Sequence, residues 1–194
     1  VRGVGVHPGL SKGKMVNAVR YAAKLIDRLP MAEAPETTEG HEGFFHPNMS
    51  RGTVVEAVVR ILVRDHDRAR YEEKKAFLEK LVEDMRAEYP QAQFSIEIRD
   101  SYENMKPYLD RAPKVLEIVR EAYRACGLEP VEAPIRGGTD GARLSARGLP
   151  CPNVFTGGMN FHGVYECLPV KSLEKSAEVA VMLAKKSAGV KSLQ

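Results

Sequence analysis

Side chains capable of chemistry gather in the stretch IRGGTDGARLSARGLPCPNVFTGGMNFHG, residues 135–163. Its two glycine pairs, Gly137-Gly138 and Gly157-Gly158, predict turns, because glycine reaches positive φ and lets backbone approach a ligand closely. Four polar side chains flank these turns: Arg136, Asp140, Asn160 and His162. Either turn alone is explained as an ordinary tight connection. Their concentration on loops between expected strands and helices, where α/β folds place their sites, predicts a functional site.

Composition limits the class of protein. The 194 residues are 43% hydrophobic and 28% charged, which is ordinary for a globular protein that can bury a core. A formal net charge of +3 is too small and too dispersed to indicate nucleic-acid binding. No apolar run is long enough to span a bilayer and no leader pattern opens the sequence, so we expect a cytoplasmic protein without a membrane partner.

Cysteines and the first residue give two further expectations. Cys126, Cys151 and Cys167 are odd in number and lack CxxC spacing, so they predict reduced thiols rather than a disulfide framework or a structural zinc site. The sequence starts at Val1, inside a strand pattern. We therefore expect either a removed leader or a piece of a longer protein.

The elements that must position these residues show two different orders of strands and helices along the chain. Residues 1–107 read as strand, helix, two strands, helix and strand, which is the ferredoxin-like βαββαβ arrangement. The expected strands are 3–7, 44–49, 53–63 and 94–98, and the expected helices run from Ser11 to before Pro30 and from 68 to 88. The β-branched strand 53–63 also has the character of a sheet edge for subunit pairing.

Residues 108–194 alternate helices with short strands. The expected helices are 113–126, 140–147 and 173–186, and the expected strands are 131–135 and 153–156. Alternation favours part of a parallel or mixed sheet, so the whole chain is predicted to be of the α/β (α+β) class. Such short strands cannot complete a covered sheet. We therefore expect this part to expose apolar surface or to be covered by another chain.

Five motifs in consistent order carry a resemblance to a known family: VGVHPGLSKGKMVNA, PETTEGHEGF, RDHDR, PIRGGTDGA and LPCPNVFTGGMNFHGVYE. Together they resemble the C-terminal half of the peptidase T family, the tripeptide aminopeptidases of the aminoacylase-like clan of two-zinc peptidases. The resemblance implies a lid and dimerisation domain at 1–107 and the end of a zinc-dependent catalytic domain at 108–194. It also implies that most zinc ligands, the bridging aspartate and the general-base glutamate lie outside this sequence.

The resemblance implies roles for particular residues. His162 aligns with the last zinc ligand, and a loop imidazole offers the neutral nitrogen that zinc binds. His7 matches the lid histidine that stabilises the oxyanion, often in the site of the partner subunit. Arg136 resembles the arginine that receives the peptide carboxylate through two parallel hydrogen bonds. Arg64 and Asn17 are further candidates for substrate binding.

Three of these residues also have a structural interpretation. His7 precedes Pro8-Gly9 and can be an ordinary turn residue, Asn17 can cap a helix, and Arg64 can pair with a neighbouring aspartate, Asp65 or Asp67.

Other polar residues near the motifs are interpreted without a metal. Asp140 is read as the start of a helix, where the helix dipole stabilises a carboxylate, and not as a metal ligand. Glu166, four residues after His162, either orients that histidine or is solvated surface. The remaining histidines, His41, His46 and His66, form no recognised ligand cluster.

The predicted function is that of part of a zinc-dependent tripeptide aminopeptidase, inactive by itself, with two zinc ions in the whole enzyme. We expect a short peptide as substrate and a homodimer formed through the lid. One alternative is a related aminoacylase, dipeptidase or carboxypeptidase of the same clan. The other is a noncatalytic dimerisation or small-ligand-binding module, based on the ferredoxin-like half.

Overall fold

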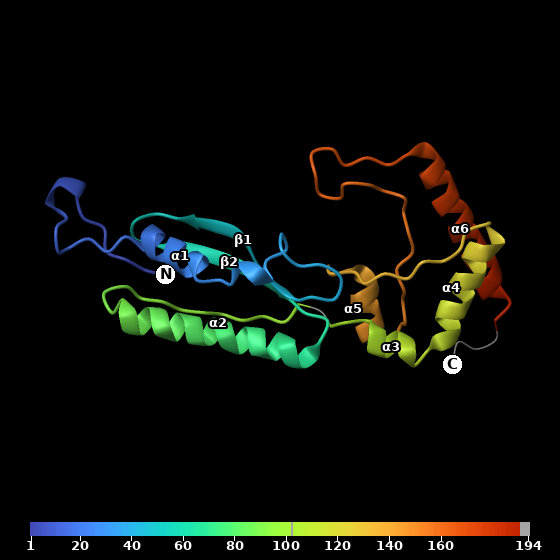
Figure 1. Cartoon of the computed structure of the whole chain (residues 1–194), viewed down its shortest axis with the longest axis horizontal. Coiled ribbons are helices and arrows are strands. Elements are labelled where there is room, and N and C mark those ends of the chain that lie inside the picture. Colours follow the sequence, from blue (N-terminus) through green and yellow to red (C-terminus); the bar gives the residue numbers. More distant parts are fainter. Residues whose placement is uncertain (102, 191–194) are drawn as a thin grey trace. The chain divides into compact units, whose positions relative to one another are not determined.

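The computed structural model describes residues 1–101 and 103–190. The chain divides into two compact units, Val1–Asp100 and a second that begins at Ser101 (Figure 1). The predicted boundary at residue 107 falls inside α3 (Lys106–Asp110).

Strands β1 (Phe44–Gly52) and β2 (Ala57–Arg64) form an antiparallel pair in the first unit. Both strands were predicted. β1 runs past its predicted end, and its pairing with β2 shifts between Pro47 and Met49, where proline lacks the N–H that a ladder needs. β2 begins later than predicted, because the Thr53 hydroxyl accepts from the backbone N–H groups of Val55 and Glu56, at 3.3 and 3.4 Å, and makes a turn.

Arg2 completes the ferredoxin-like strand order by pairing on both sides. It forms antiparallel bridges with Glu56, just before β2, and with Gln93, after the second long helix. The first strand segment, at Arg2, therefore lies between the third, which is the β2 segment, and the fourth, at Gln93. This is the strand order of a split βαβ unit. The mixed helix and strand fold predicted for this half is confirmed.

The first and last of these segments, however, form only isolated bridges, so the predictions of continuous strands at 3–7 and 94–98 are wrong. The first segment turns away after Val4, which pairs with Val16 instead. In the last segment, the carbonyl of Phe94 accepts a hydrogen bond from Arg86 Nε at 3.0 Å. A side chain thus takes a group that a ladder would use.

Two helices flank the strand pair, α1 (Ala18–Asp27) and α2 (Arg68–Glu88). The bounds of α2 are as predicted, and the Asp67 carboxylate caps it by accepting from the N–H of Arg70 at 2.9 Å. The prediction that Ser11 starts the first helix is wrong. The chain is still extended at Val16, where it pairs with Val4, and helical hydrogen bonding begins only after Asn17.

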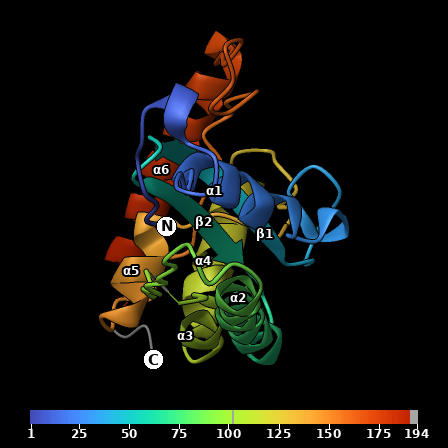
Figure 2. The same ribbon diagram turned by 90° about the vertical axis from the view of Figure 1, so that its left-hand side faces the viewer.

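Apolar side chains of both helices, of β1 and of the segments beside them form the main core of the first unit. Helices α1 and α2 pack against the strand pair and against each other (Figures 1 and 2), and Figure 2 looks along α2. The core consists of Val16, Leu25, Leu29, Phe45, Leu78, Leu81, Val82, Met85, Ala92 and Phe94. This core makes the unit a self-contained support for the loops that it carries.

The second unit is helical, with α3, α4 (Pro113–Ala125), α5 (Asp140–Ala146) and α6 (Val170–Ala188). Helix α4 packs along α6, and α3 contacts α4 and α5. The strands predicted at 131–135 and 153–156 are wrong: both segments are described, and neither is in a ladder. The N–H of Phe155 donates to the Tyr123 hydroxyl at 2.9 Å instead of to a neighbouring strand.

Large apolar side chains remain exposed on the second unit, as predicted. Val164 is 95%, Val131 88% and Tyr165 81% exposed. The largest fully buried side chains in the described part of this unit are those of Val179 and Ser145, and both are small compared with Met85 of the first unit. No helix among the described residues is long and apolar enough to cross a membrane.

Candidate functional site

His7 lies on a loop that a single bridge closes. Val4 and Val16 exchange two backbone hydrogen bonds, of 2.8 and 2.9 Å, at the base of this loop. His7 is exposed and caps the short helix η1 (Pro8–Leu10), with its Nδ1 accepting from the N–H of Gly9 at 3.2 Å. A neutral imidazole that accepts at Nδ1 carries its proton on Nε2. The loop therefore presents an N–H donor, which is the group that oxyanion stabilisation needs.

Asn17 and Arg64 occupy structural positions. The Asn17 side-chain oxygen accepts from the N–H of Val19 at 3.1 Å and caps α1, as its structural interpretation predicted. Arg64 ends β2, opposite Phe44, and donates from Nη1 to the carbonyl of Val63 at 2.8 Å. Neither contact tests a role in substrate binding.

The structure places His7 and Arg64 toward opposite ends of β2. The segment that carries His7 runs beside the residues just before β2, where Gly3 donates to the carbonyl of Val55 at 2.8 Å, and Arg64 is the last residue of the strand. An extended strand of eight residues is about 25 Å long. One copy of the first unit therefore does not bring these two side chains together.

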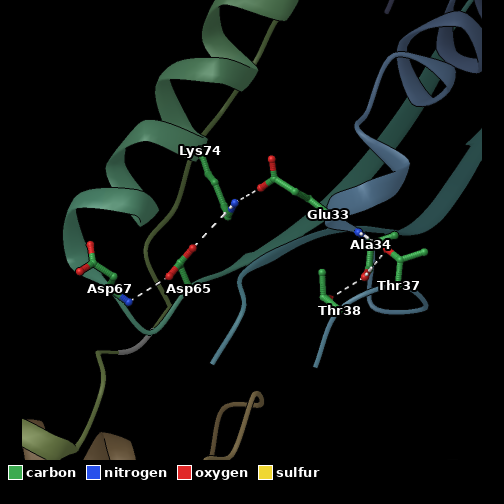
Figure 3. Close-up of polar contacts among 7 residues, drawn as sticks. All are labelled: Glu33, Ala34, Thr37, Thr38, Asp65, Asp67 and Lys74. Carbon is green, nitrogen blue, oxygen red and sulfur yellow. Dashed lines mark hydrogen bonds and ion pairs between the residues drawn. The ribbon is translucent and has the colours of Figure 1, made fainter. Parts of the chain in front are cut away.

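A buried ion pair beside Arg64 was not predicted. Lys74 Nζ lies 3.8 Å from Asp65 Oδ2 and also pairs with Glu33 (Figure 3). The side chain of Asp65 is 2% exposed and that of Lys74 11%. Asp65 also accepts from the N–H of Asp67 at 2.9 Å. Gly43 leaves room for this carboxylate, since a Cβ there would lie 2.0 Å from Asp65 Oδ2.

Threonine hydroxyls of the PETTEG motif organise the loop after η2 (Met31–Glu33). Thr37 donates to the carbonyl of Met31 at 2.6 Å. Thr38 donates to the carbonyl of Ala34 at 2.6 Å (Figure 3). Further along, the rings of His41 and His66 meet edge to face with their centroids 4.9 Å apart. Two imidazoles alone do not make a metal centre.

Arg136 and Asp140 belong to the second unit. Arg136 is half-buried, with its Nε atom buried, just before Gly137-Gly138. Asp140 is the first residue of α5, where the Thr139 hydroxyl accepts from the N–H of Ala142 at 3.2 Å, so it starts a helix as interpreted. This glycine pair has no positive φ, whereas Gly157 of the second pair has φ 81°.

His162 sits on a second loop closed by one bridge, between Met159 and Cys167. Both Asn160 and His162 have positive φ, 54° and 65°, although neither is glycine. Glu166 Oε2 accepts from the backbone N–H of His162 at 3.0 Å, and the Asn160 side-chain amide donates to the carbonyl of Tyr165 at 3.2 Å. Glu166 thus contacts the backbone of His162.

The residues that were not predicted from the sequence have only partial signals in it. Lys74 continues the helical row of Leu78, Leu81 and Met85, and a cation in an apolar row indicates a buried anionic partner. The sequence does not reveal which carboxylate fills that place. Asparagine is enriched at positive φ, but the residue type alone does not predict that Asn160 adopts it.

One comparison with known proteins concerns the first unit, and the others concern nearly the whole chain. The family described as a peptidase dimerisation domain matches residues 1–93. Two solved structures share the fold along nearly the whole chain. An aminopeptidase PepT from Bacillus cereus has a TM-score of 0.60 and 23% identity, covering 96% of this chain and 50% of that one. A Staphylococcus aureus tripeptidase has a TM-score of 0.66 and 22% identity, covering 95% and 48%.

Sequence relatives confirm the resemblance to peptidase T. Peptidase T of Vibrio parahaemolyticus is 47% identical over 96% of this chain and 46% of its own length. Peptidase T of Parabacteroides distasonis is 48% identical over the same shares, 96% and 46%. The chain therefore spans about half the length of the curated relatives that it matches.

Proposed function

We propose that the chain is half of a tripeptide aminopeptidase of the peptidase T kind. Residues 1–107 would form its lid and dimerisation domain, and residues 108–194 the end of its catalytic domain. The observation that carries this proposal is the 47% identity with peptidase T of Vibrio parahaemolyticus along 96% of the chain. Groups essential to hydrolysis would then lie on the part of the enzyme that this chain does not match, and the chain alone would be inactive.

Two zinc ions are the proposed cofactor of the whole enzyme, but the residues of this chain do not by themselves fit a zinc site. Zinc takes at least three protein ligands. The described residues contain no group of three or more His, Cys, Asp or Glu side chains that could hold a metal ion. We therefore propose His162 as one ligand of a site completed by other protein.

The remaining roles are for substrate. His7 would donate from Nε2 to the oxyanion that forms when an amide carbonyl is attacked, in keeping with the acceptor role of its Nδ1. Arg136 would bind the carboxylate at the far end of the peptide with two parallel hydrogen bonds. A fixed distance between the reacting carbonyl and this carboxylate would restrict the enzyme to short peptides. Arg64 and Asn17 are proposed as further contacts of the substrate.

A homodimer formed through the lid fits the placement of these residues. His7 and Arg64 lie toward opposite ends of β2, so within one first unit they cannot share a substrate. Two copies would let His7 of one protomer serve the site of the other. A cytoplasmic location is also proposed, because the three cysteines are free thiols.

Hydrolysis of a tripeptide tests the proposal. The purified chain should show no activity. It should gain activity with zinc when produced together with the part of Vibrio parahaemolyticus peptidase T that it does not match. In that assembly H162A should abolish hydrolysis, and R136A should raise KM strongly, whereas K185A on the exposed surface of α6 should leave the rates unchanged. A catalytically competent chain on its own, resistant to chelator, would refute the proposal.

Related hydrolases and a binding module are the alternatives. Comparing rates on a tripeptide, a dipeptide and an N-acyl amino acid would separate a tripeptidase from an aminoacylase or dipeptidase of the same clan. The match of residues 1–93 to a dimerisation domain favours the noncatalytic alternative for the first unit taken alone. Light scattering that finds a dimer, together with an assembly that never hydrolyses any of these substrates, would favour that alternative.

A further inference from the structure

The loop between Met159 and Cys167 is held by its own hydrogen bonds. Its base is the pair of backbone bonds between these two residues, of 2.9 and 3.2 Å. Inside it, the N–H of Gly163 donates to the carbonyl of Asn160 at 2.9 Å, and the N–H of Glu166 donates to the carbonyl of Gly163 at 3.1 Å. The side chains from Phe161 to Glu166 are exposed. Packing therefore contributes little to the shape of this loop, and hydrogen bonds must determine it.

Two residues of this loop have an unfavourable backbone. Asn160 and His162 have φ of 54° and 65°, in the left-handed region that side chains with a Cβ disfavour. Asparagine and histidine occur in this region more often than most residues, but it still costs free energy for any residue with a Cβ, so other contacts must hold it. Such conformations persist where surrounding contacts enforce them, and they occur often at functional sites.

Glu166 supplies the compensation at His162. Its Oε2 accepts from the N–H of His162 at 3.0 Å, a bond strengthened by the negative charge of the carboxylate. The Asn160 amide closes the other side of the loop through its 3.2 Å bond to the carbonyl of Tyr165. With φ fixed, the Cα–Cβ bond of His162 leaves the loop in one direction.

We propose that Glu166 is a positioning residue, which holds the backbone of His162 left-handed and so fixes where its imidazole is presented. The proposal rests on the proposed role of His162. It gives Glu166 a task different from that of a carboxylate bonded to the imidazole itself. Any acceptor that reaches the same N–H can perform it, and negative charge alone cannot.

Amide hydrogen exchange followed by NMR on the whole chain tests the positioning role. E166A should speed exchange of the His162 amide about tenfold or more, because its acceptor is lost. E166Q keeps an oxygen at that place and should restore exchange to within about threefold of the wild type. E174A removes another exposed glutamate, on α6, and should change nothing. Equal rates in E166A and the wild type, or the same acceleration in E174A, would overturn the proposal.

A second arm tests the link to the left-handed backbone. Glycine adopts positive φ without strain, so in the H162G background E166A should no longer speed exchange of the Cys167 amide at the base of the loop. We expect E166A to speed exchange of the Cys167 amide in the wild-type background but not in the H162G background. Equal acceleration in both backgrounds would contradict the proposal. These arms need neither metal nor activity. Retained hydrolysis by H162A in the reconstituted enzyme would instead overturn only the proposed function.

Discussion

Lys74 reaches from the apolar face of α2 to the buried carboxylate of Asp65, which is 2% exposed. Removing one partner of a buried ion pair leaves a charge without compensation. We predict that K74M lowers the free energy of unfolding of the first unit by about 2–4 kcal/mol, toward the lower part of the range for buried pairs because Lys74 retains some solvent contact. Urea denaturation followed by circular dichroism measures this change.

Lys80 is the matched control on the same helix. Its pair with Asp84 has side chains 72% and 55% exposed, where solvent screens the attraction. K80M should therefore change the free energy of unfolding by less than about 0.5 kcal/mol. Similar losses in K74M and K80M would show that the pair beside Asp65 is no more important than a surface pair.

The structural roles of single residues differed in how well the sequence predicted them. Asp140 was predictable as a helix start, and a capping role was recognised for Asn17 although the helix was expected to start at Ser11, because a cap depends on the few residues that follow it. The contacts of Lys74 and Glu33 join positions far apart in sequence, and only the packed unit brings them together. Glu166 was recognised by its spacing from His162, but spacing does not distinguish an imidazole contact from a backbone contact.

At the scale of elements, the cap of α1 makes it possible to distinguish a structural role of Asn17 from a role in substrate binding. Its side-chain oxygen accepts from the N–H of Val19. We predict that N17A destabilises the first unit by about 1 kcal/mol and that N17D, which keeps an acceptor, costs little. In the reconstituted tripeptidase, a normal KM for N17D would rule out the proposed substrate contact, because aspartate loses the amide donor. An increased KM would support that contact.

The segment after residue 93 is fastened to α2 by a side-chain contact. Tyr71 donates to Asp100 Oδ1 at 2.8 Å, and this bond is the main cause that lowers the pKa of Asp100, with Lys75 adding to it. A carboxylate with a lowered folded pKa contributes stability above its unfolded pKa and loses it as pH falls through the folded value. We predict that Y71F costs on the order of 0.5 kcal/mol at pH 7 and that this cost shrinks below about pH 4.

Denaturation at pH 7 and at pH 3 measures the two costs. Tyr108 provides the control, since its hydroxyl donates at 2.6 Å to Glu103, a near neighbour in sequence in the second unit. Y108F should leave the transition of the first unit unchanged at both values. A cost of Y71F that grows at low pH would contradict the assigned role of the Asp100 carboxylate.

Elements were predictable where they satisfy their own hydrogen bonds. Helix α2 matched its predicted bounds, because a helix closes its backbone bonds within itself and shows its apolar row in the sequence. The strands expected at 131–135 and 153–156 have the right residue types, but a strand exists only beside another strand. Their failure follows from the absence of ladder partners among the described residues of this chain.

At the scale of the whole molecule, the two units differ in how completely they bury their apolar residues. The first has a continuous core of helix and strand side chains, with Met85 fully buried. The second leaves Val131, Val164 and Tyr165 almost entirely exposed. The chain spans about half the length of its relatives. The first unit is thus complete as a folding unit, and the second has apolar surface suited to cover by other protein.

This difference predicts how the two units behave apart. A protein made of residues 1–100 should unfold cooperatively, with a midpoint close to that of the first transition of the whole chain, because its core lies entirely within it. A protein made of residues 101–194 should bind a hydrophobic dye strongly and unfold over a broad range, because its exposed apolar side chains lack cover. Addition of the part of peptidase T that the chain does not match should suppress dye binding. Cooperative unfolding of residues 101–194 without dye binding would show that this unit is complete as it stands.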